Sequence, residues 1–383
     1  MAANRLLQYS PQRCSFAQMR CGARPAKVVN PVVAKITEYG SLIDPGLNRD
    51  SCTSTLWSPA TLVSEPVVFW MCRDTQQVLK NGSIGHHLQL RLASPQGYGD
   101  PFYAFSQDQC PAGGCGDNVC GPGICGDGTR WVGWPDTPPL VVQRGGPLGI
   151  FPGWVDAYGW MAKQRLTGLT VLEDAGNSLF KVTSRFPGES IMAKTELVKD
   201  AFWTKDEVGY GTACHVIHGG YAYLYGGTPN AKLAVARVST LRGPTAFENR
   251  KNYEFYVNGK WTSKTPLASD PTIILPNTSQ SKARSIGLRS GRCSFVWIGG
   301  DSFPDADAYI STAPNAEGPW TVPKKFYSGV VGNGTLPAYS SLAHPALTDG
   351  TGNYIFISWT KTHPDPATNF DVYDQPLVRV DWA

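Results

Sequence analysis

The stretch HVIHGGYAYLYGG, residues 215–227, joins two apolar runs through a Gly-Gly pair. Runs rich in Val, Ile and Tyr are typical of strands, and Gly-Gly between two such runs indicates a hairpin. SIGLRSGRCSFVWIGG at 285–300 and HPALTDGTGNYIFISWT at 344–360 follow the same loose template of strand, Gly-containing turn and aromatic-rich strand. Self-similarity at a spacing of very roughly 60 residues, without a helix, favours the blades of a β-propeller.

The rest of the chain fits this interpretation. Hydrophobic residues make up 42% and aromatic residues 11%, with 41 Gly and 30 Pro, a composition typical of many short strands and turns. Five strand groups fit after residue 35, so we predict an all-β fold, a five-bladed β-propeller, as one domain over 35–383. VAKITEYGSL at 33–42 should pair with PLVRVDW at 376–382, because this closes the ring and removes both sheet edges.

Three segments depart from the strand pattern. Residues 1–34 are expected to be a poorly structured leader, and FPGWVDAYGWMAKQRL at 151–166 to form a short helix. A Cys- and Gly-rich insertion covers about 107–128, where Cys110, Cys115, Cys120 and Cys125 are evenly spaced. Disulfides within a Gly-rich loop fit this spacing better than a zinc site, which usually has two close Cys pairs; a four-thiolate metal site is the alternative.

The charge pattern limits the partners. The net charge of +4 comes from 34 basic and 30 acidic residues scattered without runs, so we expect neither nucleic acid nor a membrane as partner. We expect a monomer without a cofactor. Calcium bound by Asp301, Asp305 and Asp307 is an alternative, although this loop lacks the full ligand pattern of a calcium motif.

Cysteines and glycosylation motifs favour a secreted protein. The ten cysteines are an even number, and Asn81, Asn277 and Asn333 each begin an N-glycosylation motif. The first residues lack the apolar segment of a signal peptide, so a cytosolic location stays open.

Two Arg-Asp-hydroxyl triplets are the first candidate for chemistry. NRDSCTSTLW at 48–57 and FWMCRDTQ at 69–76 look like the strands of one hairpin. If Cys52 pairs with Cys72 in a disulfide, Asp50 faces Asp74 on the same side, because side chains alternate with a period of two. Opposed like charges destabilise a sheet. Such a pair is either neutralised by Arg49 and Arg73 or used to raise a pKa; we favour the second, catalytic interpretation.

Two further carboxylates are candidates. Asp136, in RWVGWPDTPPLVV at 130–142, lies on a Pro-stiffened backbone beside Trp134, as sugar sites often require, although it is equally suited to cap a turn. Glu207, in FWTKDEVGYGTACHV at 202–216, precedes an expected inner strand. Trp203 and Tyr210 would raise its pKa, as a general acid needs, and we prefer it to the neighbouring Asp206.

Residues beside these carboxylates are candidates for substrate binding. His344, before a Pro at an expected inner strand, is a secondary candidate for lining the channel; the full substrate-binding set is Arg49, Arg73, Trp134, Tyr210 and His344. No G-x-S-x-G elbow and no phosphate-binding glycine loop is present, which leaves carboxylate chemistry.

Several segments resemble known propellers. AYISTAPNAEGPW at 308–320 resembles a blade ending of five-bladed propeller glycosidases. SSLAHPALTDGTGNYIFISWT at 340–360 is similar to the His-Pro segment of a domain-of-unknown-function family of five-bladed propellers that includes endo-D-arabinanases. CRDTQ at 72–76 resembles that family's Gly-Asp-Thr, with Arg73 in place of Gly. WPDTPPLVV at 134–142 and YGTACHVIHGGYAYLYGG at 210–227 resemble secreted fungal members.

The resemblance covers about 36–383 and implies roles. Asp50 and Asp74 would be first-blade acids, Asp136 an orienting carboxylate and Glu207 a general acid. Arg73 leaves open whether Asp74 is catalytic or binds substrate. We therefore expect a glycoside hydrolase of a furanoside-containing, arabinan-like polysaccharide that inverts if its carboxyls are about 6.5–9.5 Å apart and retains at about 5–5.5 Å. A non-catalytic carbohydrate-binding propeller is the alternative.

Overall fold

The computed structural model describes most of the chain after residue 30. The described residues are 31–44, 46–58, 67–78, 82, 84–87, 130–146, 151–167, 170–186, 193–228, 233–270, 282–289, 294–300, 305–348, 353–367 and 371–383. The Cys-rich insertion, most of the expected leader, Asn81, Asn277 and Asp301 lie outside these residues. The first strand begins at Val33, just before the expected domain boundary.

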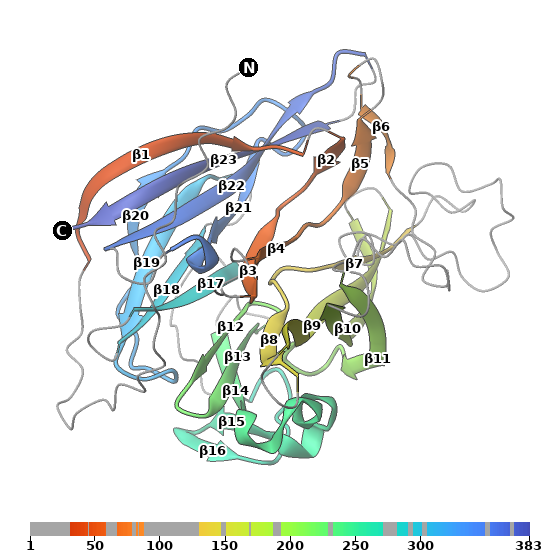
Figure 1. The fold of residues 1–383 in the computed structure, drawn as a ribbon, viewed down its shortest axis with the longest axis vertical. Helices are drawn as coiled ribbons and strands as arrows, with labels where there is room; N and C mark the ends of the chain where they lie inside the picture. The colour runs from red at the N-terminus through yellow and green to blue at the C-terminus, as the bar shows by residue number, and fades with distance from the viewer. Residues whose placement is uncertain are drawn as a thin grey trace, which may run out of the picture.

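Almost all the regular structure is β, and it forms four larger sheets (Figure 1). The first has the order β1-β23-β22-β21, and the second is β11-β10-β9-β7 with β8 also paired to β9. The third runs from β12 to β16 and the fourth from β17 to β20. Their strands are β1 (Val33–Leu42), β7 (Arg130–Trp134), β8 (Leu140–Gly145), β9 (Phe151–Thr167), β10 (Thr170–Phe186), β11 (Lys194–Trp203), β12 (Cys214–His218), β13 (Tyr221–Gly227), β14 (Leu233–Ser239), β15 (Tyr253–Val257), β16 (Lys260–Thr262), β17 (Lys282–Arg289), β18 (Ser294–Gly300), β19 (Asp307–Ala313), β20 (Lys324–Ser328), β21 (Ala338–Ala343), β22 (Tyr354–Pro364) and β23 (Asp371–Trp382).

The remaining strands form two small sheets near the N-terminus. One has the order β2-β5-β6, from β2 (Leu47–Arg49), β5 (Thr75–Val78) and β6 (Ile84–His87). The other pairs β3 (Thr53–Ser58) with β4 (Val67–Met71). Because β2 leads into β3 and β4 leads into β5, both sheets belong to one long hairpin, which we call the first hairpin.

The sheets are arranged around a common centre like the blades of a propeller (Figure 1). The contacts β3 with β8, β12 with β17 and β17 with β21 link strands of neighbouring sheets near this centre. The prediction of five similar blades was wrong for the described chain, which has four sheets of four or five strands besides the first hairpin. Whether a segment forms a full sheet or only a hairpin depends on strand pairings, which the hydrophobic periodicity of the sequence does not show.

The predicted ring closure is confirmed. β1 pairs antiparallel with β23, with Ile36 opposite Val380 and Glu38 opposite Val378. The N-terminal strand thus becomes the outer strand of the sheet that contains the C-terminus (Figure 1).

The predicted helix at 151–166 was wrong, because this segment is the long strand β9. It pairs with β10 on one side and with β7 and β8 on the other, and Val155, Tyr158 and Trp160 along it are buried. A strand buried on both faces reads as a continuous apolar run, which cannot be told from a helix by periodicity. The described helices are short 3₁₀ turns: η1 (Thr240–Arg242), η2 (Pro244–Glu248), η3 (Arg250–Asn252) and η4 (Pro345–Leu347).

Four hydrophobic clusters lie between successive sheets. One cluster joins the first hairpin to the sheet of β9, and a second joins the sheet of β9 to the sheet of β13. A third joins the sheet of β13 to the sheet of β18, and the fourth joins the sheet of β18 to the sheet of β22. Sheet-on-sheet packing of this kind is the usual source of a propeller core. In the part of the chain that the structure describes, no helix is long and apolar enough to cross a membrane.

Candidate active site

The first hairpin brings Asp50 and Asp74 face to face, as predicted. Arg49 is opposite Thr75 in the pairing of β2 with β5, and the same register continues through β3 and β4. Between them the backbone N–H of Asp50 donates to the carbonyl oxygen of Asp74 at 2.9 Å, and that of Arg73 donates to the carbonyl of Asp50 at 2.7 Å.

The predicted disulfide is present beside this pair. Cys52 and Cys72 are joined, and each is almost fully buried. Ser51, between Asp50 and Cys52, has a φ of 47°, which is unusual for a residue other than glycine. Such a conformation costs about 1–3 kcal/mol and is often found at functional sites. It separates β2 from β3 at the residue next to Asp50.

Asp50 is nearly buried, with an exposed fraction of 6%. Its Oδ1 accepts hydrogen bonds from the Ser51 hydroxyl at 2.6 Å and from the Tyr339 phenol at 2.8 Å. Burial raises the pKa of Asp50 and the charge of Asp74 raises it further, whereas Arg73 and the two hydroxyl groups act in the opposite direction; the net effect is a raised pKa. Asp50 is therefore suited to hold a proton at higher pH than an ordinary aspartate.

Asp74 and Asp136 complete a cluster of three carboxylates. The indole N–H of Trp134 donates to Oδ1 of Asp74 at 3.0 Å. Asp136 forms an ion pair with Arg73, whose guanidinium lies 5.7 Å from the centre of the Trp134 ring. The Asp136 side chain is 20% exposed, so the cluster borders solvent on this side.

Each strand that contributes to the cluster is irregular where it does so. Asp50 lies between β2 and β3, and Asp136 lies between β7 and β8. Tyr339 precedes Ser340, whose φ is 58°, and the pairing of β21 with β22 shifts register there. Bulges of this kind redirect side chains, which explains how three separate strands aim polar groups at one place.

Glu207 lies in a different environment. Its carboxylate accepts from the backbone N–H of Thr204 at 2.9 Å and forms an ion pair with Arg250. Burial acts to raise its pKa, but the hydrogen bonds from Arg250 and Thr204 outweigh this effect and the pKa is lowered. The raised pKa expected of a general acid was therefore wrong. The Arg250 guanidinium lies over the Trp203 ring instead.

Tyr210, Arg49 and His344 are also placed away from the three carboxylates. Tyr210 is fully buried among the aromatic side chains of the core, so it offers no surface to a substrate. Arg49 forms an ion pair with Asp44 at 3.0 Å and borders a cavity of about 910 Å³ that is lined by residues of the first hairpin and of β23.

His344 is fully buried. Its two ring nitrogens lie 2.9 Å from the Ser54 hydroxyl and 2.7 Å from the Ser358 hydroxyl. Burial lowers its pKa to about 3, so the ring is neutral at physiological pH. It links β3 to the sheet of β22 and has the features of a structural histidine.

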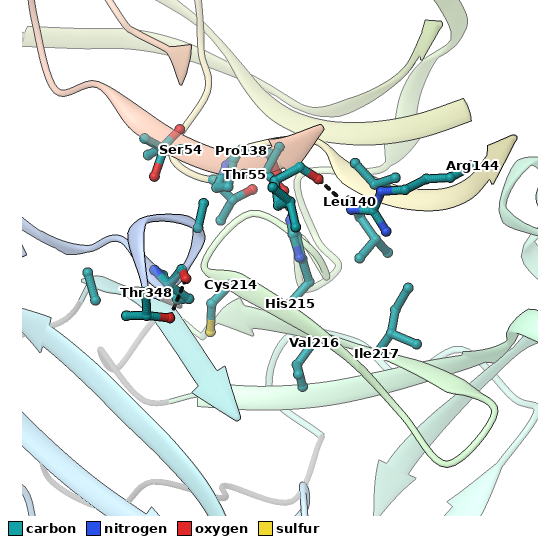
Figure 2. Close-up of a pocket in the computed structure, with 17 residues that line it drawn as sticks. Ser54, Thr55, Pro138, Leu140, Arg144, Cys214, His215, Val216, Ile217 and Thr348 are labelled. Atoms are coloured by element: carbon teal, nitrogen blue, oxygen red, sulfur yellow. Dashed lines mark hydrogen bonds between the residues drawn. The ribbon is translucent and has the colours of Figure 1, made fainter. Parts of the chain in front are cut away.

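A smaller cavity of about 350 Å³ lies near the centre of the propeller (Figure 2). β3, β8, β12 and the turn η4 contribute its walls, with Thr55, Arg144, His215 and Thr348 among the lining residues (Figure 2). Several of its polar groups already have partners within the protein: Arg144 bonds the carbonyls of Leu56 and Trp57, and His215 contacts that of Pro138. These contacts support a structural role for the cavity walls.

The described residues contain no group of three or more His, Cys, Asp or Glu side chains arranged to hold a metal. Of the acidic loop considered for calcium, Asp307 forms an ion pair with Lys325 at 3.0 Å and accepts from Ser328. Asp305 accepts from the backbone N–H of Asp307 at 2.9 Å.

Tyr339 and the backbone conformation of Ser51 were missed in the sequence. Tyr339 stands two residues after a Pro in LPAYSS at 336–341, a strand start with no charge to mark it. Ser51 was recognised only as part of a repeated triplet. Its left-handed backbone is favoured more by Gly or Asn, so no residue type indicated it.

Comparison with known proteins gives a fold but no family. No protein-family model matches the chain, and no curated protein matches its sequence. Among solved structures, the chain is similar to a putative hydrolase from Bacteroides ovatus, with a TM-score of 0.54 and 16% identity over 87% of this chain and 86% of that one. At this identity the similarity shows a shared fold alone.

Two weaker similarities are with named glycosidases. One is a putative exo-β-1,3-galactanase from Bifidobacterium bifidum, with a TM-score of 0.43, 10% identity and coverage of 91% and 96% of the two chains. The other is an α-L-arabinofuranosidase from Podospora anserina in complex with cellotriose, with a TM-score of 0.35, 9% identity and coverage of 70% and 94%. Similarity at this level supports no conclusion about activity.

Proposed function

We propose that the protein is a glycoside hydrolase whose catalytic carboxylates are Asp50 and Asp74. The observation that carries this proposal is the opposition of the two aspartates across the first hairpin, with the pKa of Asp50 raised. Two carboxyl groups in different protonation states are what glycosidic bond cleavage requires.

The two aspartates have different partners, which suggests different roles. Both hydrogen bonds to the Asp50 side chain end on Oδ1, so its proton would be carried by Oδ2. We assign Asp50 as the general acid that protonates the glycosidic oxygen. Asp74 accepts a hydrogen bond from Trp134, and we assign it as the nucleophile at the anomeric carbon.

The reaction then proceeds in two steps. Asp50 gives its proton to the leaving oxygen while Asp74 forms a glycosyl ester. A water molecule attacks this ester, Asp50 takes up the water proton and Asp74 leaves as a carboxylate, so one water is consumed for each bond broken. Arg73, Trp134 and Asp136 border the pair, and we assign them to orienting sugar hydroxyls and presenting an aromatic face.

We propose that the reaction retains the anomeric configuration, because attack by Asp74 forms a glycosyl ester that water then opens. Retaining glycosidases place their carboxyl groups about 5–5.5 Å apart, whereas inverting enzymes need about 6.5–9.5 Å. Proton NMR of the first product should therefore show the anomer of the substrate; the opposite anomer would contradict the role of Asp74 as nucleophile.

Finer proposals accompany this function. The resemblance of 72–76 to a propeller family that includes endo-D-arabinanases, and of 308–320 to five-bladed propeller glycosidases, leads us to propose a furanoside-containing polysaccharide as substrate. The Cys52–Cys72 disulfide and the glycosylation motifs support secretion, and we further propose that the protein is a monomer.

The test is a screen of purified protein against arabinans, galactofuranans and other plant and fungal polysaccharides, with products measured by mass. We expect release of oligosaccharides from at least one furanoside polymer, and loss of that release in Asp74→Asn. Asp206→Asn, an exposed carboxylate outside the cluster, is the matched control. Binding of a polymer without cleavage would instead favour the carbohydrate-binding alternative.

A further inference from the structure

The seam between the first hairpin and the sheet of β22 and β23 is polar. Hydrophobic clusters join the other neighbouring sheets, but no cluster of described residues spans this seam. Its contacts come from buried polar side chains, namely Asn48, Ser51, Gln76, Thr360 and Gln375. Buried polar groups contribute less to stability than apolar packing but specify geometry more strictly, since each must keep its partner.

Thr360 on β22 contacts the kink directly. Its Oγ1 accepts from the backbone N–H of Ser51 at 3.2 Å and lies 3.1 Å from the Ser51 hydroxyl. That same hydroxyl donates to the Asp50 carboxylate at 2.6 Å. A continuous chain of hydrogen bonds therefore joins Thr360, which is fully buried, to the group that we assign as general acid.

Gln375 on β23 holds the residues on both sides of the kink. Its Oε1 accepts from the backbone N–H of Cys52 at 2.7 Å, and its Nε2 donates to the carbonyl of Arg49 at 2.9 Å. Together with Thr360, it fixes the backbone of 49–52 in the left-handed turn at Ser51. A strained backbone of this kind persists only where its surroundings determine it.

We propose that Thr360 is a positioning residue, which orients the Ser51 hydroxyl and through it aims the Asp50 carboxylate at the substrate. This inference rests on the proposed function for its catalytic consequence, but the link from Thr360 to Asp50 is independent of any activity.

The chain offers a matched control. Thr362, two residues further along β22, is as fully buried as Thr360, and its hydroxyl likewise makes a hydrogen bond, to the carbonyl of Leu336 at 2.9 Å. Thr362 contacts the loop before β21 and not the kink. Replacing either threonine by Val removes one hydroxyl at constant shape, so a purely structural role predicts the same result for both.

The experiment compares Thr360→Val, Thr362→Val and Thr360→Ser in the full chain. The first readout is the pH dependence of the unfolding free energy, measured for each variant with and without Asp50→Asn. The difference between each variant with and without Asp50→Asn reports the titration of Asp50. Asp50 is faced by Arg73 and Asp74 on the opposite side of the hairpin and by Tyr339 on β21.

Because the Ser51 hydrogen bond lowers the pKa of Asp50, loss of its orientation should raise that pKa further. Asp50 contributes stability that is present at low pH and lost as pH rises through its folded pKa. In Thr360→Val this loss of stability should occur at higher pH than in the parent. In Thr362→Val and in Thr360→Ser it should occur at the same pH as in the parent. Equal behaviour of the two Val variants would overturn the proposal.

The second readout is catalytic. With the substrate found in the screen, kcat of Thr360→Val should fall about tenfold, because a catalytic group that is slightly misplaced reacts more slowly. The alkaline limb of its pH profile should move upward, and Thr362→Val should change neither. Absence of any activity in the parent protein would refute the proposed function and leave the first readout unaffected.

Ser51→Ala provides the check if Thr360→Val does not fold. This change keeps the backbone N–H that bonds Thr360 and removes only the hydroxyl between Thr360 and Asp50. The titration of Asp50 should again move to higher pH; an unchanged titration would contradict the hydrogen-bond link.

Discussion

Burial raises the pKa of the Asp50 carboxyl, and the charge of Asp74 adds to this effect. The ionised form is then disfavoured in the folded protein relative to the unfolded chain. Stability from this group is complete below the ordinary aspartate pKa and is lost as pH rises through the raised folded value. Asp50→Asn should therefore be less sensitive to pH than the parent between weakly acidic and neutral pH, as measured by urea unfolding at a series of pH values.

His344 should have the opposite effect on stability. Its pKa in the folded protein is lowered to about 3 by burial, so the unfolded chain binds a proton that the folded chain does not. Stability from His344 is fully present above the ordinary histidine pKa and is lost as pH falls, by at most about 1.4 kcal/mol per pH unit. His344→Gln should show a smaller loss of stability between pH 6.5 and 4. An unchanged pH dependence would show that the ring is not buried in its neutral form.

Side-chain alternation was enough to predict that Asp50 faces Asp74, because one disulfide sets the register of the whole hairpin. The lowered pKa of Glu207 could not be predicted from the sequence. Its pKa depends on Arg250, which the 3₁₀ turn η3 brings to it, and nothing in the local sequence indicates that contact. Tyr339 was missed for the same reason, since it reaches Asp50 from the far end of the chain.

The first hairpin depends on its covalent link. The Cys52–Cys72 bond spans 20 residues of sequence, and a closed loop of that size constrains the unfolded chain by about 3 kcal/mol. The Cys52→Ser, Cys72→Ser double variant should be less stable by about that amount in equilibrium unfolding. Adding dithiothreitol to the parent should lower the free energy of unfolding by a similar amount. Equal free energies of unfolding for the parent and the double variant would contradict this role of the disulfide.

Strand β9 shows that the apolar pattern of one segment does not decide between a helix and a strand. Its sequence, FPGWVDAYGWMAKQRL, has the apolar density of a buried segment, and density alone does not distinguish a helix from a strand. Pairing with β10 on one side and with β7 and β8 on the other decides the outcome. The error concerned one element and left the fold class intact.

Pairing of the N-terminal strand β1 with the C-terminal strand β23 closes the propeller. β1 covers the edge of β23, and many of its residues are exposed, so it contributes mainly by pairing. A chain that begins after residue 42 should expose the edge of β23. We expect a lower melting temperature and concentration-dependent association, measured by calorimetry and light scattering. A truncated chain that stays monomeric with the parent melting temperature would contradict this role.

An all-β propeller was predictable because hairpin signals recur along the chain and because its two ends carry complementary strands. The number of complete sheets was not predictable. The first hairpin differs from the four larger sheets in its strand pairing, and its seam with the sheet of β22 and β23 uses polar contacts where apolar packing joins the other sheets. Such contacts between distant segments leave no periodic signal in the sequence.

The central claim is that Asp50 and Asp74 perform the chemistry and that Glu207 does not. The most direct measurement is kcat/KM of Asp50→Asn, Asp74→Asn and Glu207→Gln on one furanoside polymer at the optimal pH of the parent. We predict losses of about 10²- to 10⁴-fold for the two aspartate variants, the usual effect of removing an acid or base group, and a value near that of the parent for Glu207→Gln. Full activity of the aspartate variants together with an inactive Glu207→Gln would contradict it.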